Sequence, residues 1–191
     1  MYKFSIIYHS RSHSVEKLAN EIAIGIKSTG DAKINLILCS DAKYRIEEIN
    51  DSDAIIFGSP TYFGSISSEM KEFFDSTSNI FINKKWKDKI AGAFTHASSL
   101  SGDKLMTLMQ MMVFAMQNGM IWVGQDLLAN EEVNHEWKDL DANHVNNLGS
   151  WIGPMAQSDN RRGIELSQSD LLTARLFGKR IAILTRRLKM M

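Results

Sequence analysis

The sequence predicts an α/β domain in which a parallel sheet is covered by helices on both faces. Two observations predict it. Short apolar runs alternate with stretches of helical spacing, and each run is apolar at successive positions, which is typical of strands buried on both sides. Parallel strands need crossover connections, and these are usually helices. Because the chain has 191 residues, two prolines and no linker-like stretch, we expect one domain over residues 1–191.

Five runs have the character of buried strands: Lys3–Tyr8, Ile34–Cys39, Ala54–Ser59, Ile90–Thr95 and Met120–Gly124. Helical spacing follows in a first helix that begins near Ser14 and repeats apolar residues four apart. Three further helices are expected over SSEMKEFFDST, Lys104–Gln117 and Leu171–Leu188. Ser167, followed by an acid three residues later, is typical of an N-cap for the last one.

One segment does not fit the alternation. Residues 125–148 are polar, acidic and weakly periodic, so we interpret them as an insertion between the fifth strand and the last helix. His135 and His144 lie there among carboxylates, but their spacing matches no strong metal signature. We therefore expect solvated loop residues and no metal site.

Charge and cysteine usage limit the class of protein. Lys plus Arg and Asp plus Glu are equal at 22 each, which argues against nucleic acid or anionic lipid as a partner. No apolar run approaches the ~20 residues of a membrane span, and no signal-peptide pattern is present. Cys39 has no partner for an intramolecular disulfide and is expected to be a buried thiol. We expect a cytoplasmic protein whose partners are small molecules or copies of itself.

The first candidate site lies after the first strand, in the sequence HSRSHS. Ligands of open parallel sheets bind at the carboxyl ends of the strands. The start of a helix there offers free backbone amides, to which Ser10, Ser12 and Ser14 add hydroxyls and Arg11 and His13 add charge, so the loop suits a phosphate. The loop lacks GxxxxGK[ST] and GxGxxG, which disfavours nucleoside triphosphates and dinucleotides. Alternatively, Ser14 is only an N-cap in a polar loop.

The second candidate is the loop GSPTYFGS after the third strand. Pro60 stiffens the exit from the strand and Gly64 permits a tight turn, with Tyr62 and Phe63 between them. Such a loop can place backbone amides and a ring along a flat ligand. The alternative is an aromatic turn that covers the core.

The third candidate follows the fourth strand, in FTHASSLSGDK. Thr95, His96, Ala97 and Ser98 offer backbone and side-chain donors to a polar heteroaromatic edge, and Gly102 precedes a helix. The three loops predict one crevice, with a phosphate position at one end and a planar ring at the other.

With these motifs the sequence resembles the flavodoxin-like NAD(P)H oxidoreductases, nearest to the WrbA-type NAD(P)H:quinone reductases. SPTYFGSISSEMKEFFDST carries the resemblance most strongly. It matches the family pattern at Pro60, Thr61, Phe63, Gly64, Met70, Phe73 and Asp75. YHSRSHSVEKLA stands where the family binds the ribityl phosphate of FMN, and IAGAFTHASSLSG where it contacts the isoalloxazine. QNGMIWVG resembles the start of the family's fifth strand. The likeness covers most of the chain apart from the insertion.

The resemblance implies a doubly wound sheet of strand order 2-1-3-4-5, FMN as cofactor, NAD(P)H as electron donor and a quinone or similar flat acceptor. It implies cofactor contacts at Ser10, Arg11, Ser12, His13, Ser14, Val15, Pro60, Thr61, Tyr62, Phe63, Gly64, Thr95, His96, Ala97, Ser98, Gly102 and Asn118. The last of these stands where the family commonly has a histidine near the flavin. No side-chain acid or base is required.

The resemblance also implies a homodimer or homotetramer, because Phe81 stands where the family often places a tryptophan over the flavin of a neighbouring subunit. Methionines between residues 106 and 120 suit a core or an adaptable subunit-facing helix. Two alternatives stay open for the function: a one-electron carrier of the flavodoxin type, and an accessory protein on the same fold without reductase activity. The zero net charge argues against the carrier, whose docking surface is typically acidic.

Overall fold

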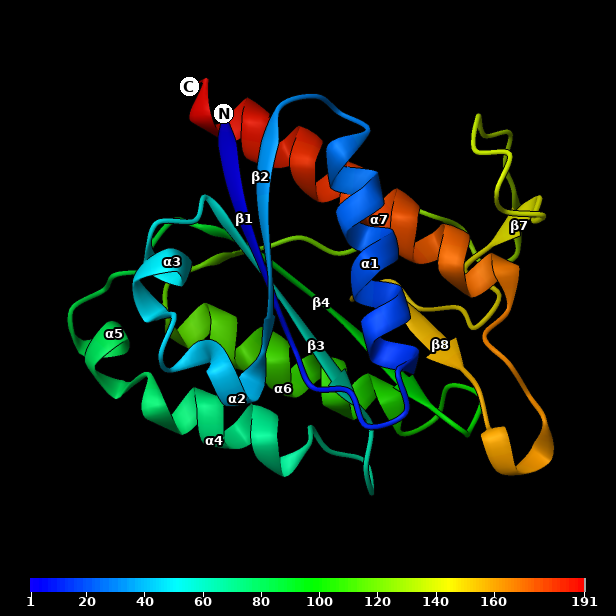
Figure 1. Cartoon of the computed structure of the whole chain (residues 1–191), viewed down its shortest axis with the longest axis horizontal. Helices are drawn as coiled ribbons and strands as arrows, with labels where there is room; N and C mark the ends of the chain where they lie inside the picture. The colour runs from blue at the N-terminus through cyan, green and yellow to red at the C-terminus, as the bar shows by residue number, and fades with distance from the viewer. Residues whose placement is uncertain (191) are drawn as a thin grey trace.

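The computed structural model describes residues 1–190 and has three layers, with a twisted sheet between two sets of helices (Figure 1). The main sheet contains β1 (Tyr2–Tyr8), β2 (Ala32–Leu38), β3 (Ala54–Pro60), β4 (Ile90–Ala97), β5 (Ile121–Trp122) and β8 (Met155–Gln157). The helices are α1 (Ser14–Lys27), α2 (Cys39–Ala42), α3 (Ile46–Asn50), α4 (Ser68–Ser76), α5 (Ser78–Ile82), α6 (Lys104–Gln117) and α7 (Gln168–Lys189). A small hairpin of β6 (Glu131–Glu132) and β7 (His144–Val145) and a 3-10 helix, η1 (Asn160–Arg162), complete the elements.

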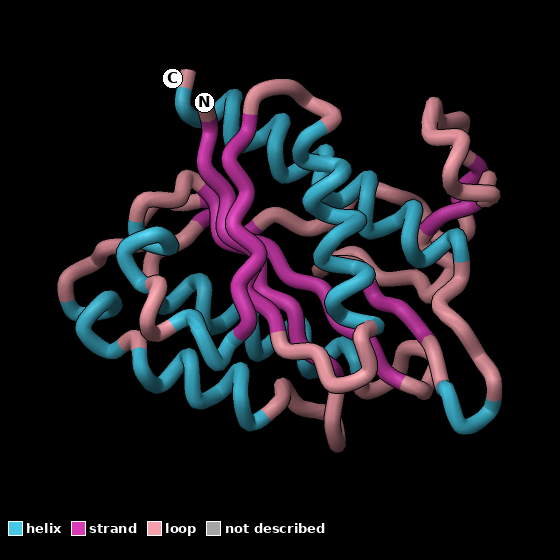
Figure 2. The backbone as a smooth tube through the Cα atoms, viewed as in Figure 1, coloured by secondary structure: helices cyan, strands magenta, loops and turns pink. Residues whose placement is uncertain are grey.

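The strands are parallel and follow the order β2-β1-β3-β4-β5, which confirms the predicted doubly wound fold. Figure 2 shows these strands side by side in the middle of the molecule, with helices on either side. The strand order reverses between β1 and β3. In such sheets a crevice forms outside the carboxyl ends of the strands at that point.

The fifth position of the sheet differs from the prediction. It is filled by two segments, because β5 pairs with Ile90 and Ala91 at the start of β4, whereas β8 pairs with residues 95–97 at its end. The predicted strand Met120–Gly124 is therefore correct only at its centre. At this free edge of the sheet the chain turns away, and the Gln125 amide donates to the carbonyl of Trp151 at 3.0 Å rather than to β4. Residues 123–154, here called the excursion, therefore leave the sheet between β5 and β8. The insertion predicted over residues 125–148 lies within the fifth strand position, not after it.

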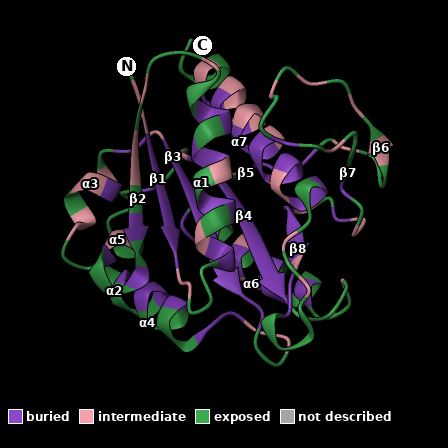
Figure 3. Ribbon diagram, turned by 45° about the vertical axis from the view of Figure 1, so that its right-hand side comes forward, coloured by how far each residue is buried: buried purple, intermediate pink, exposed green. Residues whose placement is uncertain are grey.

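The two faces of the sheet are covered by different helices. On the α1/α7 face, Phe4, Ile6 and Ile56 pack against α1 and α7. On the α4/α6 face, the intervening residues Ile7 and Phe57 pack against α4 and α6. The alternation along each strand supplies both cores, so β3 and β4 are buried at every position, as Figure 3 shows.

Helices α1 and α7 meet backbone to backbone. A side chain at Gly25 would collide with the carbonyl of Arg175, and one at Gly178 with the carbonyl of Ile22. Glycine at both positions therefore permits the close approach.

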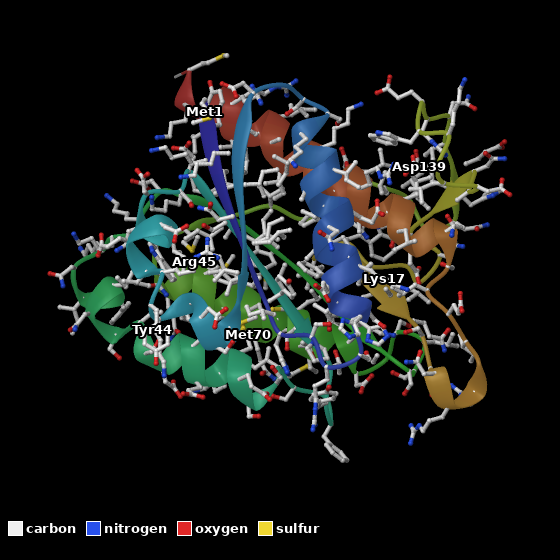
Figure 4. All side chains as sticks on the ribbon, viewed as in Figure 1. Met1, Lys17, Tyr44, Arg45, Met70 and Asp139 are labelled. Carbon is white, nitrogen blue, oxygen red and sulfur yellow. The ribbon has the colours of Figure 1, made fainter. Side chains whose placement is uncertain are left out.

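Arg175 fastens the excursion to this face of the sheet. Its side chain is 1% exposed, and its guanidinium lies 2.7 Å from the carboxylates of both Glu21 and Asp139. Asp139, labelled in Figure 4, belongs to the excursion and lies beside α7. The guanidinium carbon is also 5.3 Å from the centre of the Trp137 ring. A buried cation is thus matched by two anions and an aromatic face.

Several local predictions are confirmed. Helix α6 has the predicted bounds, and the Ser167 hydroxyl accepts from the Asp170 amide at 3.0 Å as an N-cap of α7. Cys39 begins α2 instead of ending β2, but it is buried as expected, and burial raises the pKa of its thiol to about 12. Within residues 1–190, every helix is too short or too polar to cross a membrane.

Candidate functional site

A cavity of about 610 Å³ opens at the carboxyl ends of β1, β3, β4 and β8, whose exit loops lie along the lower edge of Figure 1. Its lining residues come from these four loops. They are Arg11, Ser12, Val15, Pro60, Thr61, Tyr62, Phe63, His96, Ala97, Ser98, Ser99, Asp103, Ser158, Asp159, Asn160 and Arg161. The cavity is the crevice that the three sequence motifs predicted, with a fourth side that they did not.

The loop after β1 presents an anion-binding surface. His13 precedes α1 with a left-handed backbone, φ 61°, and makes no side-chain cap. The backbone amides of Ser12 and Val15 donate to no described residue, and Ser10 Oγ accepts from the Glu16 amide at 3.3 Å. Free amides at a helix start attract negative charge. The exposed Arg11 adds a cation on the same side of the cavity.

The loop after β3 is a tight turn that displays aromatic rings. Tyr62 and Ser65 exchange backbone hydrogen bonds of 3.0 and 3.1 Å, and the two central residues have positive φ, 50° at Phe63 and 74° at Gly64. Such a turn favours glycine, so a phenylalanine there is a strained position. The Phe63 ring is fully exposed. Tyr62 borders the cavity, and its ring meets the His9 ring in a T-shaped arrangement with the centroids 6.5 Å apart.

Three buried threonines hold this loop against the neighbouring elements. Thr61 Oγ1 lies 2.8 Å from Oγ1 of both Thr95 on β4 and Thr107 on α6. Thr95 in turn donates to the Ser59 carbonyl at 2.7 Å. Because each hydroxyl has a buried partner, the exit of β3 is fixed relative to β4 and α6.

A second hydrogen-bonded chain joins the loops after β4, β8 and β1. His96 Nε2 lies 2.7 Å from Ser158 Oγ, which lies 2.9 Å from Ser14 Oγ. Burial, with a smaller contribution from the nearby Lys104 charge, lowers the pKa of His96 to about 4, so the ring is neutral at pH 7. A neutral imidazole can donate or accept but adds no charge to the cavity.

Charged side chains lie behind the loop after β4. Lys104 is fully buried at the first position of α6, and its ammonium donates to the carbonyls of Ser99 and Leu100. Burial lowers the pKa of Lys104 to about 8, against the opposing attraction of Asp170 and Asp103. Burial raises the pKa of Asp170, whose carboxylate accepts from the Gln157 amide at 3.0 Å.

The predicted cofactor contacts fall into three groups. Ten line the cavity: Arg11, Ser12, Val15, Pro60, Thr61, Tyr62, Phe63, His96, Ala97 and Ser98. Others lie in or beside the same loops without lining it: Ser10, His13, Ser14, Gly64, Thr95 and Gly102. Asn118 is the exception. It follows α6 and borders a separate apolar groove with Phe81, so within one protomer it is not part of this cavity, because α6 ends near the amino edge of the sheet.

Sequence reasoning missed the fourth side, which Ser158, Asp159, Asn160 and Arg161 form after β8. Asp159 accepts from Arg162 Nε at 2.9 Å, and Arg162 also donates to the Ser98 carbonyl at 3.2 Å, so this loop is tied to the loop after β4. The available signal was GPMAQSDN, a short apolar run followed by small polar residues, as at the other three strand ends.

Known proteins share this fold and sequence. A family model described as NADPH-dependent FMN reductase matches residues 26–134. Flavodoxin FldP of Pseudomonas aeruginosa is 30% identical, over 95% of this chain and 96% of its own. NAD(P)H dehydrogenase (quinone) of Archaeoglobus fulgidus is 29% identical, over 95% and 96%. The solved structure of a flavodoxin, WrbA-like protein from Agrobacterium tumefaciens has a TM-score of 0.73 and 32% identity, over 98% and 99%.

These likenesses confirm the resemblance to flavodoxin-like NAD(P)H oxidoreductases near WrbA. The two relatives and the solved structure match 95 to 98% of this chain, and the cavity lies where such a sheet binds its ligand. The chain therefore belongs to the NADPH-dependent FMN reductase family and is a flavin oxidoreductase of flavodoxin-like fold.

Proposed function

We propose that this protein binds FMN in the cavity and transfers two electrons from NAD(P)H to a quinone or a similar flat acceptor. The observation that carries the proposal is that the two ends of the cavity differ in their chemistry. One end has the free amides and hydroxyls of the α1 start, and the other has the Tyr62 ring and the polar loop after β4.

The residues present fit FMN. Hydroxyls, free helix amides and Arg11 together suit a phosphate dianion without a metal. The volume of about 610 Å³ falls within the range of ~300 to 1,000 Å³ that is usual for small-molecule sites. The loop offers one such phosphate position and no dinucleotide motif, which favours FMN over FAD.

Bound FMN would supply the hydride and electron chemistry, and the residues of this chain would orient it. Tyr62 would place the ring, while the backbone of Phe63 and Gly64 would lie along one ring edge. The amides of Ser98 and Ser99 donate to no described residue, so they are available to the pyrimidine edge, where donors favour negative charge. The neutral His96 is positioned by Ser158 and needs no proton exchange in this scheme.

Cofactor identity and placement are tested by one titration series. The ligand released by acid from the reconstituted protein should have the mass of FMN. Replacing Arg11 and Ser12, the two polar residues of this loop that line the cavity, together by alanine should weaken FMN binding by about 1 to 3 kcal/mol, at ~1 kcal/mol for the hydroxyl contact and more for the charged one. Riboflavin, which lacks the phosphate, is the control ligand, and its affinity should fall much less than that of FMN. Reconstitution with FAD alone, or equal losses for FMN and riboflavin, would contradict the placement.

The flavodoxin-type carrier is the second candidate, because a 30% identical relative is named a flavodoxin. The balanced charge of the chain supports the reductase instead. FMN-loaded protein is mixed anaerobically with NADPH and NADH in turn, and benzoquinone is then added. Rapid bleaching of the flavin band and its rapid return indicate the reductase. No bleaching by either nucleotide, with dithionite reduction in two well-separated one-electron steps, would establish the carrier.

We also propose that the protein is a homodimer or homotetramer. An apolar groove of about 650 Å³ runs between α5 and α6, and its lining includes the exposed Phe81, Ile82, Met106 and Val113. A second copy would cover these side chains and bring its own groove, with Asn118, toward another subunit. Light scattering at micromolar concentration should exceed the protomer mass of 21.6 kDa; a mass equal to it would contradict this assembly.

A further inference from the structure

Two features of its position disfavour a positive charge on Lys104. It is fully buried, and it is the first residue of α6, where the helix dipole presents its positive end. Burial and a like-signed dipole both oppose an ammonium group. Such a charge needs partners that hold it in place, and a buried charge beside a cavity is a candidate for a role in the site.

The contacts of Lys104 show what it holds. Its ammonium donates to the carbonyls of Ser99 and Leu100, and therefore ties down the loop between β4 and α6 from below. Ser99 lines the cavity. The carboxylates that attract the ammonium are Asp170 and Asp103, and the first is engaged by the Gln157 amide.

The charge of Lys104 also reaches the cavity. Its ammonium donates to the carbonyl of Ser99, and Ser99 lines the cavity together with Asp103, so the charge lies directly behind this wall. A charge that acts on a group at the cavity wall also acts on a ligand against that wall, because screening is weak in a buried site.

We propose that Lys104 is a positioning residue that fixes the loop after β4 and supplies a positive charge favouring the reduced form of FMN over the oxidised form. This inference rests on the proposed function. The oxidised ring is neutral, whereas uptake of two electrons and one proton leaves it with one negative charge. A fixed cation therefore stabilises the reduced form selectively, without itself taking part in proton or hydride transfer.

The fold contains a matched control. Lys89, a part-buried lysine, donates to the carbonyls of Asn50 at 2.9 Å and Ser52 at 2.5 Å, and burial lowers its pKa too. It directly precedes β4, so it lies at the amino edge of the sheet, opposite the cavity. Lys89→Met removes a similar ammonium from two carbonyls without altering the charge near the cavity.

The experiment compares midpoint potentials of the FMN-loaded wild type, Lys104→Met, Lys104→Arg and Lys89→Met. In Lys104→Met the preference for reduced over oxidised FMN should fall about tenfold, which lowers the two-electron potential by about 30 mV. Lys104→Arg, which keeps the charge, and Lys89→Met should stay near the wild type.

An unchanged potential in an FMN-loaded Lys104→Met protein would overturn the inference and leave the proposed function intact. If that variant does not fold, Lys104→Gln, which keeps a donor without the charge, is compared with Lys104→Arg, and equal potentials in this pair would equally overturn it. A wild type that binds no FMN would instead overturn the proposed function, and this inference with it.

Discussion

The two faces of the sheet are built from the same strands, but the helices that cover them pack in different ways. On the α1/α7 face, Gly25 and Gly178 bring two helix backbones together, and Arg175 fastens the excursion against them. On the α4/α6 face, an aromatic cluster packs beneath the helices, but the outer side of α6 carries exposed apolar side chains over a groove.

Within one protomer, apolar side chains are thus more completely buried on the α1/α7 face than on the α4/α6 face. On the α1/α7 face the exposed large apolar side chains of the helices are few, namely Ile24 on α1 and Leu188 on α7, and the excursion packs against part of α7. Exposed Met106, Met109, Val113 and Met116 on α6 form an apolar patch of the kind that marks an interaction site. Substitutions on the two faces should therefore have different consequences, for folding on one and for assembly on the other.

The largest effect is expected at the glycine contact. Gly178→Val should lower the free energy of unfolding by at least about 3 kcal/mol, because the new side chain would collide with the backbone of Ile22. Urea denaturation measures it. Gly102→Ala is the control, since nothing lies within 4 Å of the added methyl group, and it should change stability by less than ~0.5 kcal/mol. Equal losses in both would show that the α1/α7 contact can relax.

The aromatic cluster of the opposite face should respond next. The Phe114 ring stacks on Phe74 at 3.6 Å and meets Phe57 edge-on at 5.6 Å. Phe114→Ala should cost about 2 to 4 kcal/mol, somewhat less than a fully buried ring, because Phe114 is partly exposed. Phe81→Ala, which removes an exposed ring from the groove, should leave the unfolding of the isolated protomer nearly unchanged. A comparable loss there would mean that the groove is part of the core.

Assembly offers the third test. Val113→Glu places a charge in the groove at a side chain that is 49% exposed, and should weaken self-association at least tenfold, about 1.4 kcal/mol. Ile24→Glu is the matched control on α1, where the side chain is 39% exposed. Sedimentation equilibrium of both variants measures the association. If Ile24→Glu dissociates the oligomer and Val113→Glu does not, the subunits meet through the α1/α7 face and not through the groove.

The smallest effect concerns pH and the Arg175 contact. Its guanidinium lowers the pKa of Asp139 to about 2 from an ordinary 3.8. A carboxyl with a lowered native pKa stabilises the fold above its ordinary pKa and loses that contribution as the pH falls through the native one. The Tm advantage of the wild type over Asp139→Asn should therefore shrink as the pH falls from about 4 to about 2.

The control for the pH series is Asp141→Asn, which removes a neighbouring exposed carboxyl that forms no ion pair with a described residue. Its Tm should run parallel to the wild type over the same range. A Tm difference between the wild type and Asp139→Asn that stays constant across the series would show that ionised Asp139 does not stabilise this face.

Local patterns predicted much of this molecule because local physics decides it. The period of Lys104–Gln117 and the N-cap at Ser167 depend on neighbouring residues, and both are confirmed. The strand order came from a family resemblance, since no local pattern encodes it. Ser158–Arg161 escaped prediction because β8 has only three residues, too few for a period to be recognised. Asn118 lies outside the cavity of its own protomer, because the length of α6 carries it toward the other edge of the sheet, and a contact with a flavin of a neighbouring subunit stays a prediction.

The split fifth strand has a consequence for how this protein can change. The chain leaves the sheet beside Ala91 and returns beside Thr95, four residues further along β4 and so only about 13 Å away. A segment whose two ends are that close can be lengthened, shortened or exchanged at small cost in chain entropy. It returns as β8, whose exit loop forms one wall of the cavity. The excursion can therefore vary in length with the sheet order intact and with β8 still carrying its exit loop to the cavity, as long as a carboxylate continues to meet the buried Arg175.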